Sequence, residues 1–213
     1  MVGGINAQGG ATYSADSVNQ GLPPIPPFSV PIPDCTGMPA ITQTSVGPDD
    51  VVFTPGISAG GITMNNPTTT FTFQPGLYCI GGNNSFVVNS GIVEGAGVMF
   101  YLTGDVSLSG GSHTLSAPTD GSIVDSAGQV WNGMLFFVEG NNDVTINGNV
   151  DSTLQGTIYA PDSDCNLNGG GSTTGHDLCL VCDTINVNGG AGLTINYNGA
   201  NQYEPPTNLD LLK

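Results

Sequence analysis

Five cysteines, Cys35, Cys79, Cys165, Cys179 and Cys182, have the most distinctive side-chain chemistry in this sequence. In an exported protein most such thiols are oxidised to disulfides. A bridge between Cys35 and Cys79 would tie the proline-rich run before Cys35 to an apolar strand. Among the three late cysteines, Cys165 can pair with either Cys179 or Cys182, which leaves one thiol over. We therefore expect a disulfide framework built from these five residues.

A zinc site is the alternative use of the late cysteines. It would combine Cys165, Cys179 and Cys182 with His176. The spacing of these residues matches no established zinc pattern. Alternate residues of a strand point to the same side, which also counts against Cys179 and Cys182 sharing one ion. Disulfides are favoured over zinc for these reasons.

The stretch DSDCNLNGG suggests a second kind of metal site. An EF-hand calcium loop needs glycine at its sixth position and glutamate at its twelfth, where this chain has Leu167 and Thr173. The loop therefore fails the EF-hand pattern. Calcium held between Asp162, Asp164 and Asp177 stays as a candidate site, and no other cofactor is expected.

Few residues suggest catalysis. His113 and His176 are the only histidines, and neither lies in a Ser or Cys elbow motif. Pairs of acids such as Asp49 and Asp50 are typical of solvated turns rather than of glycosidase carboxylates. The sequence therefore predicts a protein that is not an enzyme.

Two aromatic residues are candidates for stacking against a ligand. Trp131 is the only tryptophan, and it lies in the irregular segment 118–132. With Tyr101 it could form a platform for a sugar ring. The alternative is that Trp131 belongs to a segment that covers the side of the fold.

The most discriminating feature of the composition is the absence of bases. The 213 residues contain 17 acids and a single Lys or Arg, which is Lys213, so the net charge is −16. Binding of nucleic acid, nucleotides, anionic polysaccharides or lipid headgroups needs cations to neutralise their negative charge. We therefore exclude nucleic acid and nucleotides as partners and disfavour the other anionic ligands.

Glycines recur in two series with a fixed offset. The glycines of the first series each close a polar strand, and they are Gly91, Gly110, Gly148, Gly169 and Gly189. The intervals between successive members are 19, 38, 21 and 20 residues. A second series opens the apolar strands 13 to 15 residues earlier, at Gly76, Gly97, Gly133 and Gly156. Strands repeated every 20 residues or so, without a helical pattern, are typical of a solenoid.

These series predict an all-β, right-handed parallel β-helix of about five coils. The expected parts are an extension with a proline-rich strap (1–34), the solenoid (35–199) and a tail (200–213). VGGINAQGG near the start resembles the closing half of one more coil. Stacked coils would place Asn147, Asn168 and Asn188 in an amide ladder. An antiparallel β-sandwich or jelly roll is the alternative architecture.

Two strands are apolar on both faces. The runs VMFYL (98–102) and MLFFV (134–138) carry large apolar side chains at successive positions. Only one face of such a strand can fill the coil interior. We therefore expect the other face to lie under a covering segment.

Short motifs add a family resemblance. FQPGLYCIGG, GVMFYLTG, LSAPTDG, GMLFFVEG and GTIYAPDSDCNLNGGG follow one another in an order and spacing similar to those in the C-terminal region of TadG-like proteins of Tad/Flp pilus assembly. The resemblance covers roughly residues 30–199. It implies a β-solenoid with a cell-envelope role linked to pili or adhesion, and it transfers no catalytic residue. The N-terminal membrane helix usual in that family is absent from this chain.

We therefore expect an extracellular structural or adhesive protein of a bacterial surface or pilus-like appendage. Its expected partners are further copies, stacked head to tail in a fibre, or other surface and pilus proteins. Membrane attachment would need a segment outside this chain. A carbohydrate-binding or carbohydrate-degrading module is the first rival. Ice binding is the second, although the threonines of 68–72 do not recur at the coil period.

Overall fold

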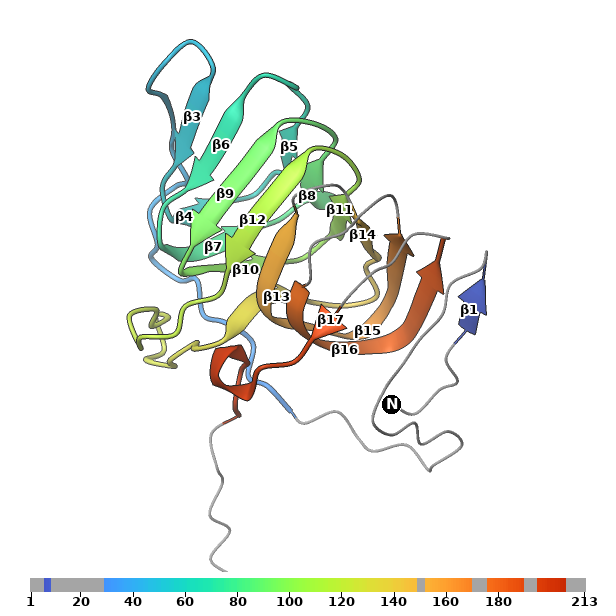
Figure 1. Cartoon of the computed structure of the whole chain (residues 1–213). Helices are drawn as coiled ribbons and strands as arrows, with labels where there is room; N and C mark the ends of the chain where they lie inside the picture. The colour runs from blue at the N-terminus through green and yellow to red at the C-terminus, as the bar shows by residue number, and fades with distance from the viewer. Residues whose placement is uncertain (1–5, 9–28, 149–151, 170–175, 190–194, 206–213) are drawn as a thin grey trace, which may run out of the picture.

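The computed structural model describes residues 6–8, 29–148, 152–169, 176–189 and 195–205. Their strands wind into a parallel β-helix of six turns (Figure 1). Among the described strands only the β2–β3 pair is antiparallel. The predicted solenoid is therefore confirmed, and the sandwich alternative is wrong. No helix among these residues is long and apolar enough to cross a membrane.

Each turn contributes a strand to three stacked faces. Face A consists of β3 (Asp50–Phe53), β6 (Thr70–Phe73), β9 (Ile92–Ala96) and β12 (Ser112–Ser116). Face B consists of β4 (Gly56–Ser58), β7 (Gly76–Ile80), β10 (Val98–Leu102) and β13 (Met134–Val138). Face C consists of β5 (Ile62–Met64), β8 (Asn84–Val88), β11 (Asp105–Leu108) and β14 (Val144–Gly148).

Two long strands complete the stack. β15 (Thr153–Gly169) and β16 (His176–Asn188) each pass through all three faces and form the fifth and sixth turns. Short strands lie at the two ends of the stack. They are β2 (Gln43–Ser45) on β3, and β17 (Ile195–Asn196) and β1 (Asn6–Gln8) on β16. A single 3-10 turn, η1 (Gly199–Asn201), follows.

The first turn is the one that the glycine series missed. Its strands are only three or four residues long, and it closes with Asn65 and Asn66 where later turns close with glycine. The 38-residue interval in the glycine series contains the segment between β12 and β13. This segment is an insertion that lies outside the turns of the β-helix. Six turns therefore replace the predicted five.

Aromatic residues fill the interior of the solenoid. Phe73 contacts the rings of Phe53, Tyr78, Phe86 and Phe100 at centroid distances between 4.6 and 5.6 Å. Phe100 stacks in turn on Phe136 of the next turn. These side chains are almost fully buried, and burial of each large apolar side chain stabilises the fold by about 2 kcal/mol.

A second core lies on the outside of face B, as the doubly apolar strands predict. Its wall is formed by outward residues of the face, namely Leu77, Cys79, Met99, Met134, Phe137 and Tyr159. Three segments cover them: the strap through Val30, the insertion through Ile123 and Trp131, and the C-terminal segment through Tyr203. The strap crosses several turns, because Val30 packs near Tyr159 of the fifth turn whereas Ala40 pairs with Ile57 of the first.

Candidate functional site

Four of the five cysteines form disulfides. Cys35 is bonded to Cys79, which fixes the strap to β7 of face B. Cys165 is bonded to Cys182, which joins the fifth turn to the sixth. Cys179 is the free thiol; it is half-buried, and burial raises its pKa. The strap bridge agrees with the expectation, and of the two late pairings the structure has Cys165–Cys182. Two of the four residues considered for zinc, Cys165 and Cys182, are thus held in a disulfide.

The three aspartates proposed for calcium do not come together. Asp162 and Asp164 are exposed between the parts of β15 that belong to faces B and C. Asp177 pairs with Asn196 on face A, and its carboxylate accepts bonds from Asn201 and Gln202. Among the described residues no three His, Cys, Asp or Glu side chains are grouped as metal ligands. The structure therefore does not bring this trio together, and Asp177 instead anchors the C-terminal segment.

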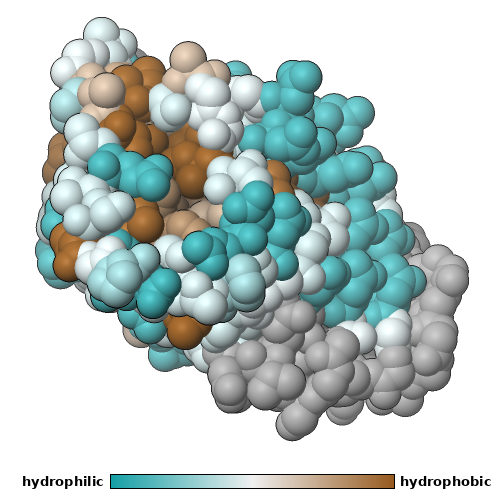
Figure 2. Space-filling model, turned by 90° about the horizontal axis from the view of Figure 1, so that it is seen from above, coloured by the Kyte–Doolittle hydropathy of each residue, from teal (hydrophilic) through white to brown (hydrophobic). Residues whose placement is uncertain are grey.

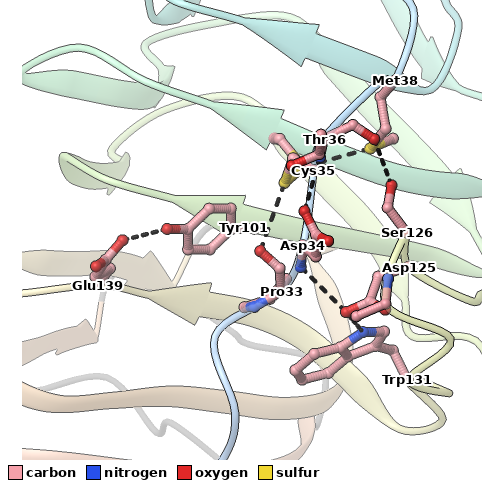
Figure 3. Close-up of a disulfide and its surroundings, with 12 residues drawn as sticks. Pro33, Asp34, Cys35, Thr36, Met38, Tyr101, Asp125, Ser126, Trp131 and Glu139 are labelled. Atoms are coloured by element: carbon pink, nitrogen blue, oxygen red, sulfur yellow. Dashed lines mark hydrogen bonds between the residues drawn. A yellow bond between two sulfur atoms is a disulfide. The ribbon is translucent and has the colours of Figure 1, made fainter.

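Trp131 is not a stacking platform. The side chain has no exposed surface, packs edge-on against Phe137 and stacks on Tyr203 at 5.8 Å. Its indole N–H donates to Asp125 (Figure 3). Trp131 thus closes the second core, which was the alternative interpretation. Tyr101 is half-buried at the edge of that core, and its hydroxyl bonds to Glu139.

Asp125 organises the insertion around Trp131. Its Oδ1 accepts from the backbone N–H groups of Ala127 and Gln129, at 3.0 and 2.9 Å. Its Oδ2 accepts from Trp131 at 3.0 Å and from the backbone N–H of Asp34 in the strap at 3.1 Å. One carboxylate therefore joins the insertion to the strap beside the disulfide (Figure 3). The sequence carries no motif that reveals this role.

Both histidines point into the solenoid. His113 is 1% exposed and His176 is 2% exposed. His113 Nδ1 lies 3.3 Å from Ser152 Oγ, and its Nε2 lies 2.8 Å from the carbonyl oxygen of Gly110. Burial lowers the pKa of both imidazoles. The Ser–His contact resembles part of a catalytic set, but Ser152 is only 2% exposed, so no substrate can reach it.

Two amide ladders run along the outside of face C. Nδ2 of Asn168 donates to Oδ1 of Asn147 at 2.9 Å, and Nδ2 of Asn188 donates to Oδ1 of Asn168 at 3.3 Å. The predicted ladder is thus present. A second ladder joins Asn186 to Asn166 at 3.2 Å. The ladders make this face polar, and their bonds run along the stacking direction.

A pocket of about 490 Å³ lies between the insertion and the C-terminal segment. The insertion contributes Gln129, Val130 and Asn132, and the C-terminal segment contributes Gln202 and Glu204. The lining combines amides and one carboxylate with the apolar atoms of Val130, Ala200 and Tyr203. Such groups suit an uncharged ligand rich in hydroxyls.

The first-turn end of the solenoid is apolar. Ile41, Val51 and Ile62 pack on the interior core but remain partly exposed, because no further turn from the described part of the chain covers them. Val46 and Ile57 beside them are 64% and 43% exposed. Figure 2, seen from above, shows the apolar residues gathered in a hollowed region at this end of the molecule.

Comparison with known proteins places most of the solenoid in one family. Residues 63–202 match the family described as "Domain of unknown function (DUF7305)". No curated protein and no solved structure matches the chain. The match begins within β5 and ends after η1, so it covers the second to sixth turns together with the insertion.

Proposed function

Because the chain belongs to the DUF7305 family, whose description names no activity, we propose from the molecule itself that it is a structural solenoid of the bacterial cell exterior. The observation that carries this proposal is the bracing of the fold. The Cys35–Cys79 disulfide and the second core tie the strap, the insertion and the C-terminal segment onto one wall of the β-helix, and the Cys165–Cys182 disulfide joins the last two turns. Disulfides are typical of oxidising, non-cytoplasmic compartments.

The surface chemistry supports the same role. The chain has one basic residue, so few proteases that cleave after Lys or Arg could attack it. Face C presents repeated amides rather than a convergent set of reactive groups, and both histidines lie inside. The TadG-like motifs of the sequence agree with an appendage or adhesive setting. An extended, inert wall is suited to carrying contacts rather than to running a reaction.

Antibody labelling of intact cells tests this proposal. Antibodies against the folded domain are applied to producing cells before and after permeabilisation, with a cytoplasmic protein as the control. Equal labelling in both conditions is the expected result. Labelling that needs permeabilisation, together with recovery of the protein in the cytoplasmic fraction, would refute the extracellular role.

Binding of a neutral saccharide is a second candidate function, favoured by the pocket rather than by Trp131. Gln129, Asn132 and Glu204 line it, and no cation lies among its lining residues to attract an anion. Screening of uncharged glycans against the wild type and the Gln129→Ala variant tests this candidate. A hit that the variant loses supports it, and the absence of hits removes it.

A further inference from the structure

The first-turn end differs among its three faces. β2 covers the outer edge of β3, and Ile41 and Ile57 each donate a backbone N–H to a carbonyl oxygen across the edge of β4. Within the described part of the chain, β5 pairs only with β8. The open backbone edge at this end therefore belongs to face C, next to the partly exposed Ile62.

The hydrogen bonds show which groups of β5 face outward. Met64 accepts a bond of 2.8 Å at its carbonyl oxygen from Asn89, in the loop after β8, so its backbone groups point toward the second turn. Because backbone groups alternate along a strand, the N–H and C=O of Thr63 point away from the solenoid. Thr63 thus offers one donor and one acceptor to an added strand.

The opposite end of face C shows that such an edge accepts a strand. β1 lies parallel to β16 there, with Ala7 opposite Val187 and Gln8 opposite Asn188. β1 is thereby the seventh strand of face C, although it comes from the start of the chain (Figure 1). By the alternation that applies to β5, Ala7 is the residue of β1 whose backbone groups point outward.

We propose that a second copy of this chain docks on the first-turn end, with its β1 adding as a parallel strand to the outer edge of β5. The inference rests on the proposed structural role and names its partner. All strands of face C run in the same direction, so head-to-tail stacking of two copies continues the parallel ladder without a change of strand direction. If the strand register of face C continues across the junction, Asn6 of the added copy lies opposite Thr63 of the first copy, and Ala7 of the added copy lies opposite Met64.

The docked end also buries apolar surface. Ile41, Val51 and Ile62 already contact the interior core, and a further turn above them would complete their burial. A second copy supplies such a turn in the correct strand direction. An unrelated globular partner would leave the edge of β5 without a strand, so we favour self-docking over such a partner.

The geometry sets a repeat distance for the resulting fibre. Face C has seven strands per copy, from β5 to β1, and adjacent strands lie about 4.8 Å apart, which gives an axial repeat of about 34 Å. The net charge of −16 opposes stacking. Because salt shortens the screening length to about 3 Å at 1 M, assembly should strengthen as the salt concentration rises.

Two proline variants test the interface from its two sides. Thr63→Pro removes the outward N–H of β5, and Ala7→Pro removes that of β1, whereas the bonds to β8 and β16 stay intact. Thr63→Val and Ala7→Ser are the matched controls. Sedimentation is measured in high salt at protein concentrations up to about 1 mM, where contacts of weak-interface strength associate.

The wild type and both controls are expected to form long species, and each proline variant alone is expected to stay monomeric. An equimolar mixture of the two proline variants retains one compatible pair of ends and should therefore stop at dimers. Tryptophan fluorescence and thermal melting establish that each variant is folded. If a proline variant does not fold, the axial repeat of wild-type fibres in electron micrographs decides the question.

A monomeric wild type under all these conditions would overturn the inference. So would mixtures that grow beyond dimers, or fibres whose repeat is not near the length of seven strands. A monomer that intact cells still display on their surface would remove self-docking but keep the structural role. A protein confined to the cytoplasm would remove the structural role itself, so the two failures are distinguishable.

Discussion

The indole nitrogen of Trp131 donates a hydrogen bond of 3.0 Å to Oδ2 of Asp125. The same oxygen accepts the backbone N–H of Asp34, 91 residues earlier in the chain. Trp131 is the only tryptophan and is fully buried, so its fluorescence reports directly on this junction. The junction holds the strap and the insertion over the outer core of face B.

Replacement of Asp125 by alanine should open the junction. It removes four hydrogen bonds, one of them to the buried Trp131, and we expect a loss of about 3 kcal/mol in the free energy of unfolding. Urea unfolding followed by Trp131 fluorescence measures the loss. Asp120→Ala, at an exposed turn of the same insertion, is the control and should change stability little. Equal stabilities of the two variants would contradict the role of Asp125.

The Cys35–Cys79 bridge should contribute more to stability than the Cys165–Cys182 bridge. The two bonds span 44 and 17 residues, and the chain-entropy treatment assigns them about 4 and about 3 kcal/mol. Paired Cys→Ser variants compared by chemical denaturation measure the difference. Loss of the longer bridge should also increase proteolysis within the strap, whereas loss of the shorter one should not. The reverse order of stabilities would contradict this assignment.

The amide ladder can be tested with one change that breaks a bond and one that does not. Asn168 donates to Asn147, so Asn168→Asp loses that bond and should cost about 1 kcal/mol. Asn166 only accepts from Asn186 in the second ladder, so Asn166→Asp keeps its bond and serves as the charge-matched control. Urea midpoints compare the two variants. Identical midpoints would show that the ladder bonds do not contribute to stability.

Stability should fall as the pH drops below about 6.5. Burial lowers the pKa of His113 and His176 from the ordinary value of 6.5, and for His113 the charge of His176 acts in the same direction. The unfolded chain therefore takes up protons at a higher pH than the folded chain, which favours unfolding as the pH falls. Urea midpoints measured between pH 7.5 and 5 should decrease, and the decrease should be smaller for the His113→Gln/His176→Gln double variant. An equal decrease in urea midpoint for the wild type and the double variant would show that the two histidines do not cause the loss of stability.

Periodic features of the fold could be predicted from the sequence because each turn repeats the same local constraint. Gly189 has a φ of +108°, and a Cβ there would lie 2.4 Å from the carbonyl oxygen of Gly169 in the turn below. Close contacts of this kind between successive turns require glycine once per turn. They are the reason that a glycine series can be recognised in the sequence. The doubly apolar runs of β10 and β13 predicted a covered outer face for the same reason.

Features that depend on one long-range contact could not be predicted. Nothing in the sequence near Trp131 indicates that Tyr203 of the C-terminal segment stacks on it, or that its partner Asp125 also binds Asp34, 91 residues earlier in the chain. Asp177 looked like a metal ligand for the same reason, since its amide partners lie more than 20 residues away. The first turn escaped notice because asparagine closes it.

The thiol state of the protein in its own cells shows whether the solenoid is braced by disulfides outside the cytoplasm. Protein recovered from the outside of producing cells is alkylated at once and mapped by non-reducing peptide mass spectrometry. We expect Cys35–Cys79 and Cys165–Cys182 bridges with Cys179 as the one alkylated thiol. Recovery of the protein only from the cytoplasm, with all five cysteines alkylated, would contradict an extracellular solenoid braced by disulfides.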